Sequence, residues 1–90
     1  MPGPRDQVED RDWTTAETDD PAVRSAQRLA ANLAQAMQDQ GLTLEALAVT
    51  AGVSAATISN TRNGRSWPSV LVVARLEDAL GTALWPPHGN

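Results

Sequence analysis

Apolar residues recur every three or four positions over residues 21–40, which is the spacing of one face of an α-helix. Asp20 is a favourable N-cap, and Pro21 fits the first helical position, where its missing N–H is not needed. Gly41 suits the left-handed position that follows the last helical residue. The pattern predicts a helix that begins after Asp20 and ends at Gly41. Its inner face consists of Ala26, Leu29, Ala30, Leu33 and Met37.

Two short helices with similar capping residues are predicted next. The first has Thr43 as its N-cap and ends at Gly52, and the second has Ser54 as its N-cap and ends at Asn63-Gly64. In each helix, an apolar residue before the cap and another at the fourth helical position form a hydrophobic staple. The turn between the two helices has only three residues. So short a connection sets two helices at a steep angle, as in a helix-turn-helix.

A fourth helix is predicted between Ser69 and Gly81, where the apolar positions again follow a helical period. Leu84 and Trp85 are expected to fold back over the core, and the two prolines that follow stop any further helix. No stretch shows the alternation or the turn residues of a β-hairpin. The sequence therefore predicts an all-α fold.

The first nineteen residues contain almost no apolar side chains except Val8 and Trp13. Such a segment buries too little surface to offset the entropy lost on ordering. We therefore predict a disordered acidic arm over residues 1–19, a folded domain over residues 20–85 and a flexible tail over residues 86–90.

The formal net charge of −4 is unevenly distributed. Residues 1–20 carry two arginines against seven carboxylates, a net charge of −5, whereas residues 21–90 carry five arginines against four carboxylates, a net charge of +1. The folded part can therefore bind DNA, although its charge does not require it. The tethered arm is expected to repel DNA and to compete for the arginines; the alternative is that it only aids solubility.

Composition excludes several classes of function. The chain of 90 residues has no cysteine, and its single histidine, His88, lies in the tail. Neither a metal nor another cofactor is expected. The hydroxyl groups of Ser54, Thr57 and Ser59 have no base near them in the sequence, so we do not expect an enzyme. The polar start is unlike a secretory signal, and no apolar stretch is long enough to cross a membrane. We expect a cytoplasmic protein.

The predicted third helix keeps small and polar residues on the face away from its apolar stripe. These are Ala55, Ala56, Ser59, Asn60 and Asn63. A helix whose outer face carries only small side chains can enter the major groove of DNA, which is about 12 Å wide. The first residues of the helix would then contact base edges.

The same residues resemble the Cro/repressor-type helix-turn-helix family (XRE family). The resemblance runs from the first helix to Leu84 and rests on a set of short motifs. These are Gly41-Leu42-Thr43, Leu47-Ala48, Gly52-Val53-Ser54, Thr57-Ile58-Ser59, Gly64, Pro68-Ser69 and Leu80-Gly81. The family implies a compact lambda-repressor-like domain of four to five helices. It also implies sequence-specific binding to double-stranded DNA, usually as a dimer on a palindromic operator and in transcriptional regulation.

Carried over by position, the family's base contacts fall at Ala55, Ala56 and Asn60. Its phosphate contacts fall at Thr43, Ser54, Asn63 and Arg65. We add Thr57 and Arg62 to the predicted phosphate contacts, Arg62 because it flanks the turn after the third helix. The alternative for the alanines is that they only favour helix formation, and for Asn60 and the arginines that they are solvated surface residues.

Three positions depart from the family pattern. Leu44 stands where the family often has a glutamine that reaches DNA, and it is expected to be exposed. Met37 and Arg62 stand where the family usually has a buried Arg–Glu pair. We expect Met37 to fill this space with apolar atoms while Arg62 extends outward. The fifth helix, often a dimerisation element, is reduced to residues 82–85.

The sequence thus favours a repressor-type transcription regulator that binds double-stranded DNA as a homodimer and is associated with the nucleoid when bound. An antitoxin that represses its own operon is a closely related alternative. A different alternative is a protein-interaction module on the same fold, in which the third helix binds a protein partner instead of bases.

Overall fold

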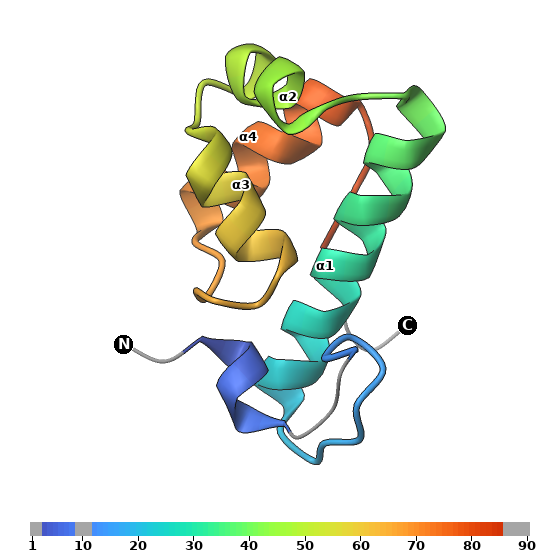
Figure 1. Ribbon diagram of the computed structural model, residues 1–90, viewed down its shortest axis with the longest axis vertical. Coiled ribbons are helices and arrows are strands. Elements are labelled where there is room, and N and C mark those ends of the chain that lie inside the picture. Colours follow the sequence, from blue (N-terminus) through green and yellow to red (C-terminus); the bar gives the residue numbers. More distant parts are fainter. Residues whose placement is uncertain (1–2, 9–11, 86–90) are drawn as a thin grey trace.

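The structure is a computed structural model that describes residues 3–8 and 12–85 (Figure 1). A short 3-10 helix, η1 (Pro4–Gln7), precedes four α-helices in the described residues. These are α1 (Pro21–Gln40), α2 (Leu44–Ala51), α3 (Ala55–Arg62) and α4 (Val70–Leu80). The all-α prediction is confirmed for this part of the chain. The predicted tail, residues 86–90, lies outside it.

The first three α-helices begin directly after the residues that the sequence predicted as their N-caps, and α4 begins after Ser69, near which its start was predicted. The side chains of Asp20, Thr43, Ser54 and Ser69 all accept a hydrogen bond from a backbone N–H in the first turn of their helix. These bonds satisfy donors that have no partner inside the helix. The caps therefore set the helix boundaries through contacts that are local in sequence.

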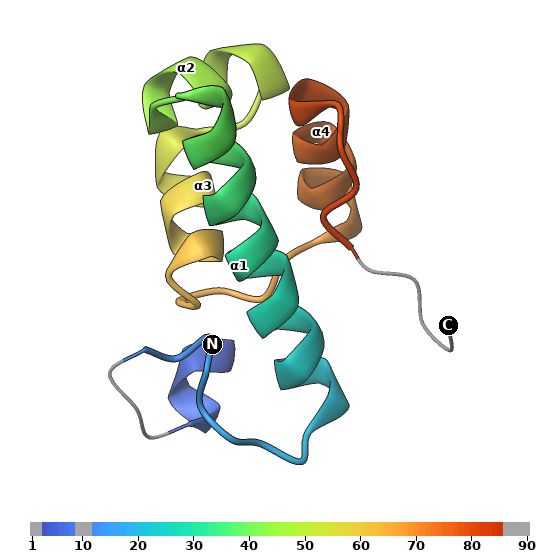
Figure 2. The same cartoon turned by 90° about the vertical axis from the view of Figure 1, so that its right-hand side faces the viewer.

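One apolar core joins the four α-helices. The long helix α1 runs beside α3, while α2 packs across the ends of α3 and α4 (Figures 1 and 2). The fully buried side chains at the centre of this main core are Leu29, Leu33, Leu47, Ile58, Leu76 and Leu84. Each α-helix contributes at least one residue to this set, and Leu84 comes from the segment that follows α4. The staples and stripes predicted from the sequence thus meet in a single cluster.

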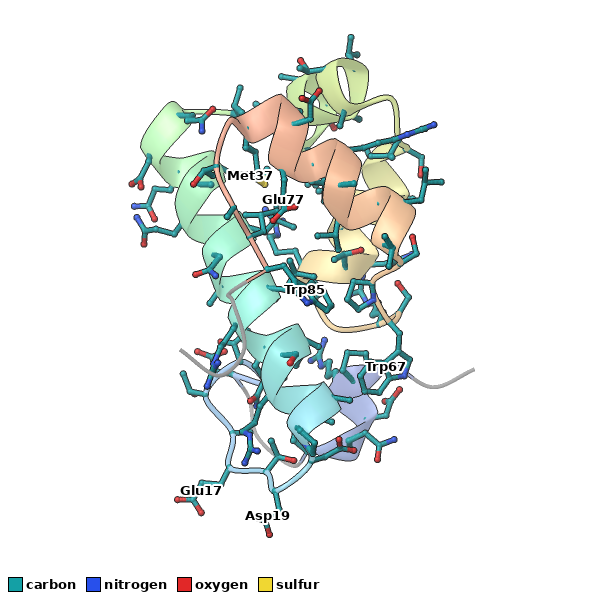
Figure 3. All side chains as sticks on the ribbon, turned by 180° about the vertical axis from the view of Figure 1, so that it is seen from behind. Glu17, Asp19, Met37, Trp67, Glu77 and Trp85 are labelled. Atoms are coloured by element: carbon teal, nitrogen blue, oxygen red, sulfur yellow. The ribbon has the colours of Figure 1, made fainter. Side chains whose placement is uncertain are left out.

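The segment after α4 folds back onto the core, as predicted. Leu84 is fully buried, and the backbone N–H groups of Leu84 and Trp85 donate to Oε2 of Glu77 at 2.8 and 3.1 Å. The Asn32 amide on α1 donates to the Leu84 carbonyl at 3.0 Å. Trp85 and Trp67, in contrast, remain 38% and 37% exposed and cover the core only in part (Figure 3).

The described residues of the N-terminal arm pack on the folded domain. Residues 3–8 and 12–19 lie against α1 and the turn after α3, and Trp13 is only 5% exposed. Trp13 packs on Ala26 and Ala30, and the buried Gln27 amide donates to the carbonyls of Trp13 and Ala16, both at 2.8 Å. A buried tryptophan removes on the order of 200 Å² from water, which stabilises its docking by about 5 kcal/mol at most. One large ring on an alanine face therefore orders a segment that its average composition predicts to be disordered.

Within the described residues, no helix is both long and apolar enough to span a membrane.

Candidate nucleic-acid interface

Helices α2 and α3 are joined by a tight turn that α4 holds from outside. Gly52 ends α2 with a φ of 72°, a left-handed conformation that favours glycine. The guanidinium of Arg75 on α4 donates to the Gly52 carbonyl at 3.1 Å. This hydrogen bond links the turn to α4 and helps to fix the orientation of α3 relative to α2. The sequence analysis did not predict it, because 23 residues separate the two partners.

The outer face of α3 is small, polar and accessible. Ile58 and Thr61 are buried on the core side, whereas Ala56 is exposed. Asn60 is half-buried and lies beside Ala56, four residues along the helix, whereas the half-buried Ala55 lies three residues before the buried Ile58. Of the three residues predicted to contact bases, Ala56 and Asn60 therefore share the side of α3 that the core leaves uncovered, and Ala55 borders it.

Hydroxyl groups cluster at the N-termini of α2 and α3. The Thr43 hydroxyl accepts from the Ala46 N–H at 3.1 Å, and the Ser54 hydroxyl accepts from the Thr57 N–H at 3.0 Å. The Ser54 and Thr57 hydroxyls also share a hydrogen bond of 2.7 Å. Because a hydroxyl that accepts a capping bond keeps its own proton, Thr43 and one member of the Ser54–Thr57 pair can still donate to a phosphate.

The turn after α3 presents the remaining predicted phosphate contacts. The Asn63 amide donates to the Ser59 hydroxyl at 3.2 Å, and the Arg65 N–H donates to the Asn60 carbonyl at 2.9 Å. These bonds hold the turn against the end of α3. The side chain of Arg65 is exposed, so its guanidinium is available to an anionic partner.

Met37 and Arg62 replace an ion pair with a contact to sulfur. Met37 is 4% exposed and belongs to the main core, which confirms that it fills this position with apolar atoms. Arg62 is half-buried, and its guanidinium nitrogen lies 4.0 Å from the Met37 sulfur. Leu44 is also half-buried and packs against the main core. The expectation that Leu44 is exposed is therefore wrong, because the start of α2 lies close enough to the core to cover this side chain.

The N-terminal arm reaches the end of α3, which the sequence did not indicate. The Trp13 indole N–H donates to the Arg62 carbonyl at 3.4 Å, and the Arg5 N–H donates to the Gly64 carbonyl at 2.9 Å. Gly64 has a φ of 72°, and a Cβ atom there would lie 2.6 Å from the Trp13 ring. Glycine is thus required at this turn both by the backbone and by the arm that packs on it.

Among the described residues, no group of acidic or histidine side chains could hold a metal ion. His88 lies outside these residues.

Comparisons with known proteins match this part of the molecule. A family model described as helix-turn-helix matches residues 33–84. The structure of the clp gene regulator ClgR from C. glutamicum aligns with a TM-score of 0.60 and 33% identity, over 74% of this chain and 83% of that one.

A second structure shares the fold. The restriction-modification controller protein C.AhdI from Aeromonas hydrophila aligns with a TM-score of 0.59 and 21% identity, over 63% of this chain and 86% of that one. A comparison with curated proteins gave no match. Since the family match covers more than half of the chain and includes α2, the turn and α3, the chain belongs to the helix-turn-helix family of the Cro/repressor type.

Proposed function

We propose that this chain is a repressor-type transcription regulator that places α3 in the major groove of double-stranded DNA. The observation that carries the proposal is the outer face of α3, where Ala56 and Asn60 lie on the side away from the core and Ala55 lies at the edge of that side. An asparagine can bond to adenine through two hydrogen bonds, and an alanine methyl can contact the methyl group of thymine.

Hydrogen-bond donors at both ends of this face support the same arrangement. Thr43, Ser54 and Thr57 lie at helix N-termini, whose free N–H groups and dipoles attract phosphate. Asn63 and Arg65 lie at the opposite end of α3. Contacts of this kind orient a protein on the DNA backbone, while the contacts between them read the bases.

A role in regulation is supported by the relative of known function. ClgR is described as a regulator of the clp gene and is 33% identical over most of its length. Likeness to C.AhdI, at 21% identity, supports only the fold. We propose that this chain regulates transcription by occupying an operator.

Specific binding in this proposal requires a homodimer. One α3 contacts only a few base pairs, so two copies would bind half-sites about 34 Å apart. The start of α4 offers an apolar face for the second copy: Val70 is 88% exposed and Leu71 is 59% exposed. A shallow groove beside these residues is lined by Pro68, Val73 and Trp85 among others.

The proposal is tested by selecting bound sequences from a pool of random DNA duplexes and then titrating the selected duplex at several salt concentrations. We expect a palindromic site, and an affinity that falls as salt rises because bound arginines release counterions. The absence of binding at low salt, or binding that does not depend on salt, would contradict the proposal.

The exposed apolar face also favours a second candidate, a protein-interaction module that binds a protein partner through α4. Large exposed apolar side chains that lie close together often mark protein interfaces. In that case the patch would bind a different protein, and the chain alone would be monomeric. Sedimentation of the pure protein separates the two candidates, since only the homodimer proposal expects a dimer.

A further inference from the structure

The N-terminal arm packs directly on the backbone of the turn that follows α3. Figures 1 and 2 both place η1 next to this turn. The Arg5 N–H and the Trp13 indole donate to carbonyls of the turn, as described above. Gly3 is buried, and a Cβ atom at this position would overlap the backbone of Arg65. The arm is thus fitted to the end of the helix that is proposed to read DNA.

This packing creates an open pocket between the arm, α1 and the end of α3. Its volume is about 460 Å³. The arm contributes Arg5 and Asp12 to its lining, α3 and its C-cap contribute Arg62 and Asn63, and alanines of α1 contribute apolar atoms. Two arginines and one asparagine from segments far apart in the sequence therefore line one pocket.

We propose that this pocket binds a phosphate group of the DNA backbone, and that Arg5 is a phosphate-binding residue. The inference rests on the proposed function, because it requires α3 to be docked on DNA. Asn63 and Arg62 are already predicted phosphate contacts, and Arg5 adds a cation beside them from outside the region that the family model matches, residues 33–84.

The charges around the pocket favour an anion. A guanidinium group binds phosphate oxygens through two parallel N–H donors, and the charge strengthens both bonds. Asp12 is the carboxylate that lines the pocket, and it accepts hydrogen bonds from the hydroxyl and N–H of Thr14. The Asp6 carboxylate is bonded to the Gly3 N–H at 3.0 Å. Arg5 and Arg62 thus line the pocket with one carboxylate, Asp12, which already accepts hydrogen bonds from Thr14.

The pocket changes the expected role of the arm. Its net negative charge predicts only repulsion of DNA or improved solubility. The packed arm instead holds Arg5 beside the predicted phosphate contacts, while Glu17 and Asp19 point into solvent at the far end of the molecule (Figure 3). Glu17 and Asp19 do not line the pocket that contains Arg5, so these two carboxylates and the arginine of one arm can have opposite effects on DNA binding.

The first experiment compares Arg5→Ala with Arg24→Ala in the full chain. Both side chains are exposed and both changes remove one positive charge, but Arg24 lies on α1 beside a different pocket. A random-sequence duplex is a sufficient probe, since phosphate contacts do not depend on sequence. We expect Arg5→Ala to lower affinity about fivefold at low salt. The slope of log affinity against log salt should fall by about 1.

The control should change affinity less and leave the slope unaltered. Equal effects of the two substitutions, or an unchanged slope for Arg5→Ala, would overturn the phosphate site while leaving the proposed function intact. Failure of the unmodified protein to bind the duplex would overturn both. Circular dichroism of each variant checks that the helices are retained.

The second experiment tests whether Arg5 must be positioned by the arm. Gly3→Ala keeps every charge but adds a methyl group where the Arg65 backbone lies, so it should displace η1. We expect this variant to lose about as much affinity as Arg5→Ala. Wild-type affinity in Gly3→Ala would mean that Arg5 acts only through its overall charge, which would contradict a built pocket.

Discussion

At the scale of single residues, Arg62 is the side chain whose environment departs most from the family pattern. Its guanidinium contacts the Met37 sulfur, and its side chain is only half-buried. Replacement of a buried ion pair by apolar packing is often neutral or stabilising, since charges no longer need to leave water. The expectation that Arg62 extends outward is wrong, because its guanidinium turns toward the Met37 sulfur. The side chain nevertheless stays partly accessible, and no carboxylate partner of Arg62 is seen in the described residues.

We predict that Arg62→Ala lowers the free energy of unfolding by less than about 1 kcal/mol, as is usual for a residue outside the core. It should nevertheless lower the affinity for duplex DNA several-fold. Urea unfolding and DNA titration of the same samples measure the two effects. A loss of several kcal/mol of stability would show that Arg62 has a structural role that its described contacts do not explain.

Asn60 is predicted to contact a base, so its substitution tests the sequence specificity of DNA binding. Asn60→Ala should cost about 1–3 kcal/mol of discrimination at one base pair. Its matched control is Arg65→Ala, which should weaken binding to all sequences alike because Arg65 is predicted to contact phosphate. Competition between the selected site and single-base variants measures both. If each substitution weakened every sequence equally, Asn60 would not contact a base.

At the scale of elements, the arm and the main core form separate apolar clusters. Trp13 packs with Ala26 and Ala30 on the first half of α1, whereas Leu33 and Ile58 belong to the core formed with the other helices. Loss of the Trp13 ring should therefore release the arm without disrupting the helix-turn-helix.

We predict that Trp13→Ala lowers the free energy of unfolding by about 3 kcal/mol, near the lower end for a buried tryptophan. The helical signal in circular dichroism should stay close to that of the unmodified protein, and amide exchange should increase in the arm. The control is Trp85→Ala, because Trp85 is 38% exposed and should cost less. Equal losses of stability for the two variants would contradict the docking of the arm through Trp13.

At the scale of the whole molecule, the start of α4 is the predicted contact between two copies. A charged residue in an apolar contact loses its hydration without gaining a partner. Val70→Asp should therefore shift the protein from dimer to monomer in sedimentation while leaving the helices intact, since Val70 is 88% exposed. Affinity for the palindromic site should fall more than about tenfold, because each half-site is then bound alone.

Val49→Asp is the matched control for the dimer contact. Val49 is 85% exposed on α2 and does not line the groove proposed for the second copy, so this substitution should leave the dimer unchanged in sedimentation. A protein that is monomeric before any substitution, or a Val70→Asp variant that remains dimeric, would contradict the proposed interface.

The sequence by itself determined the helices, because the interactions that bound them are local. The predicted caps Asp20, Thr43 and Ser54, and Ser69 at the predicted start of α4, each accept a hydrogen bond from an N–H two or three residues away. Such bonds depend only on neighbouring residue types, which are visible in the sequence. The accessible face of α3 also followed from periodicity, since Ile58 must turn inward and thereby turns Asn60 outward.

Only the tertiary structure decided which distant segments meet. The arm was predicted to be disordered from its average polarity, yet its ordering depends on one ring, Trp13, that fits the alanines of α1. The Arg75 bond to Gly52 and the approach of Arg5 to Arg62 likewise join residues far apart in the chain. No local pattern encodes such pairs, because their free energy arises only when packing brings both partners together and removes water between them.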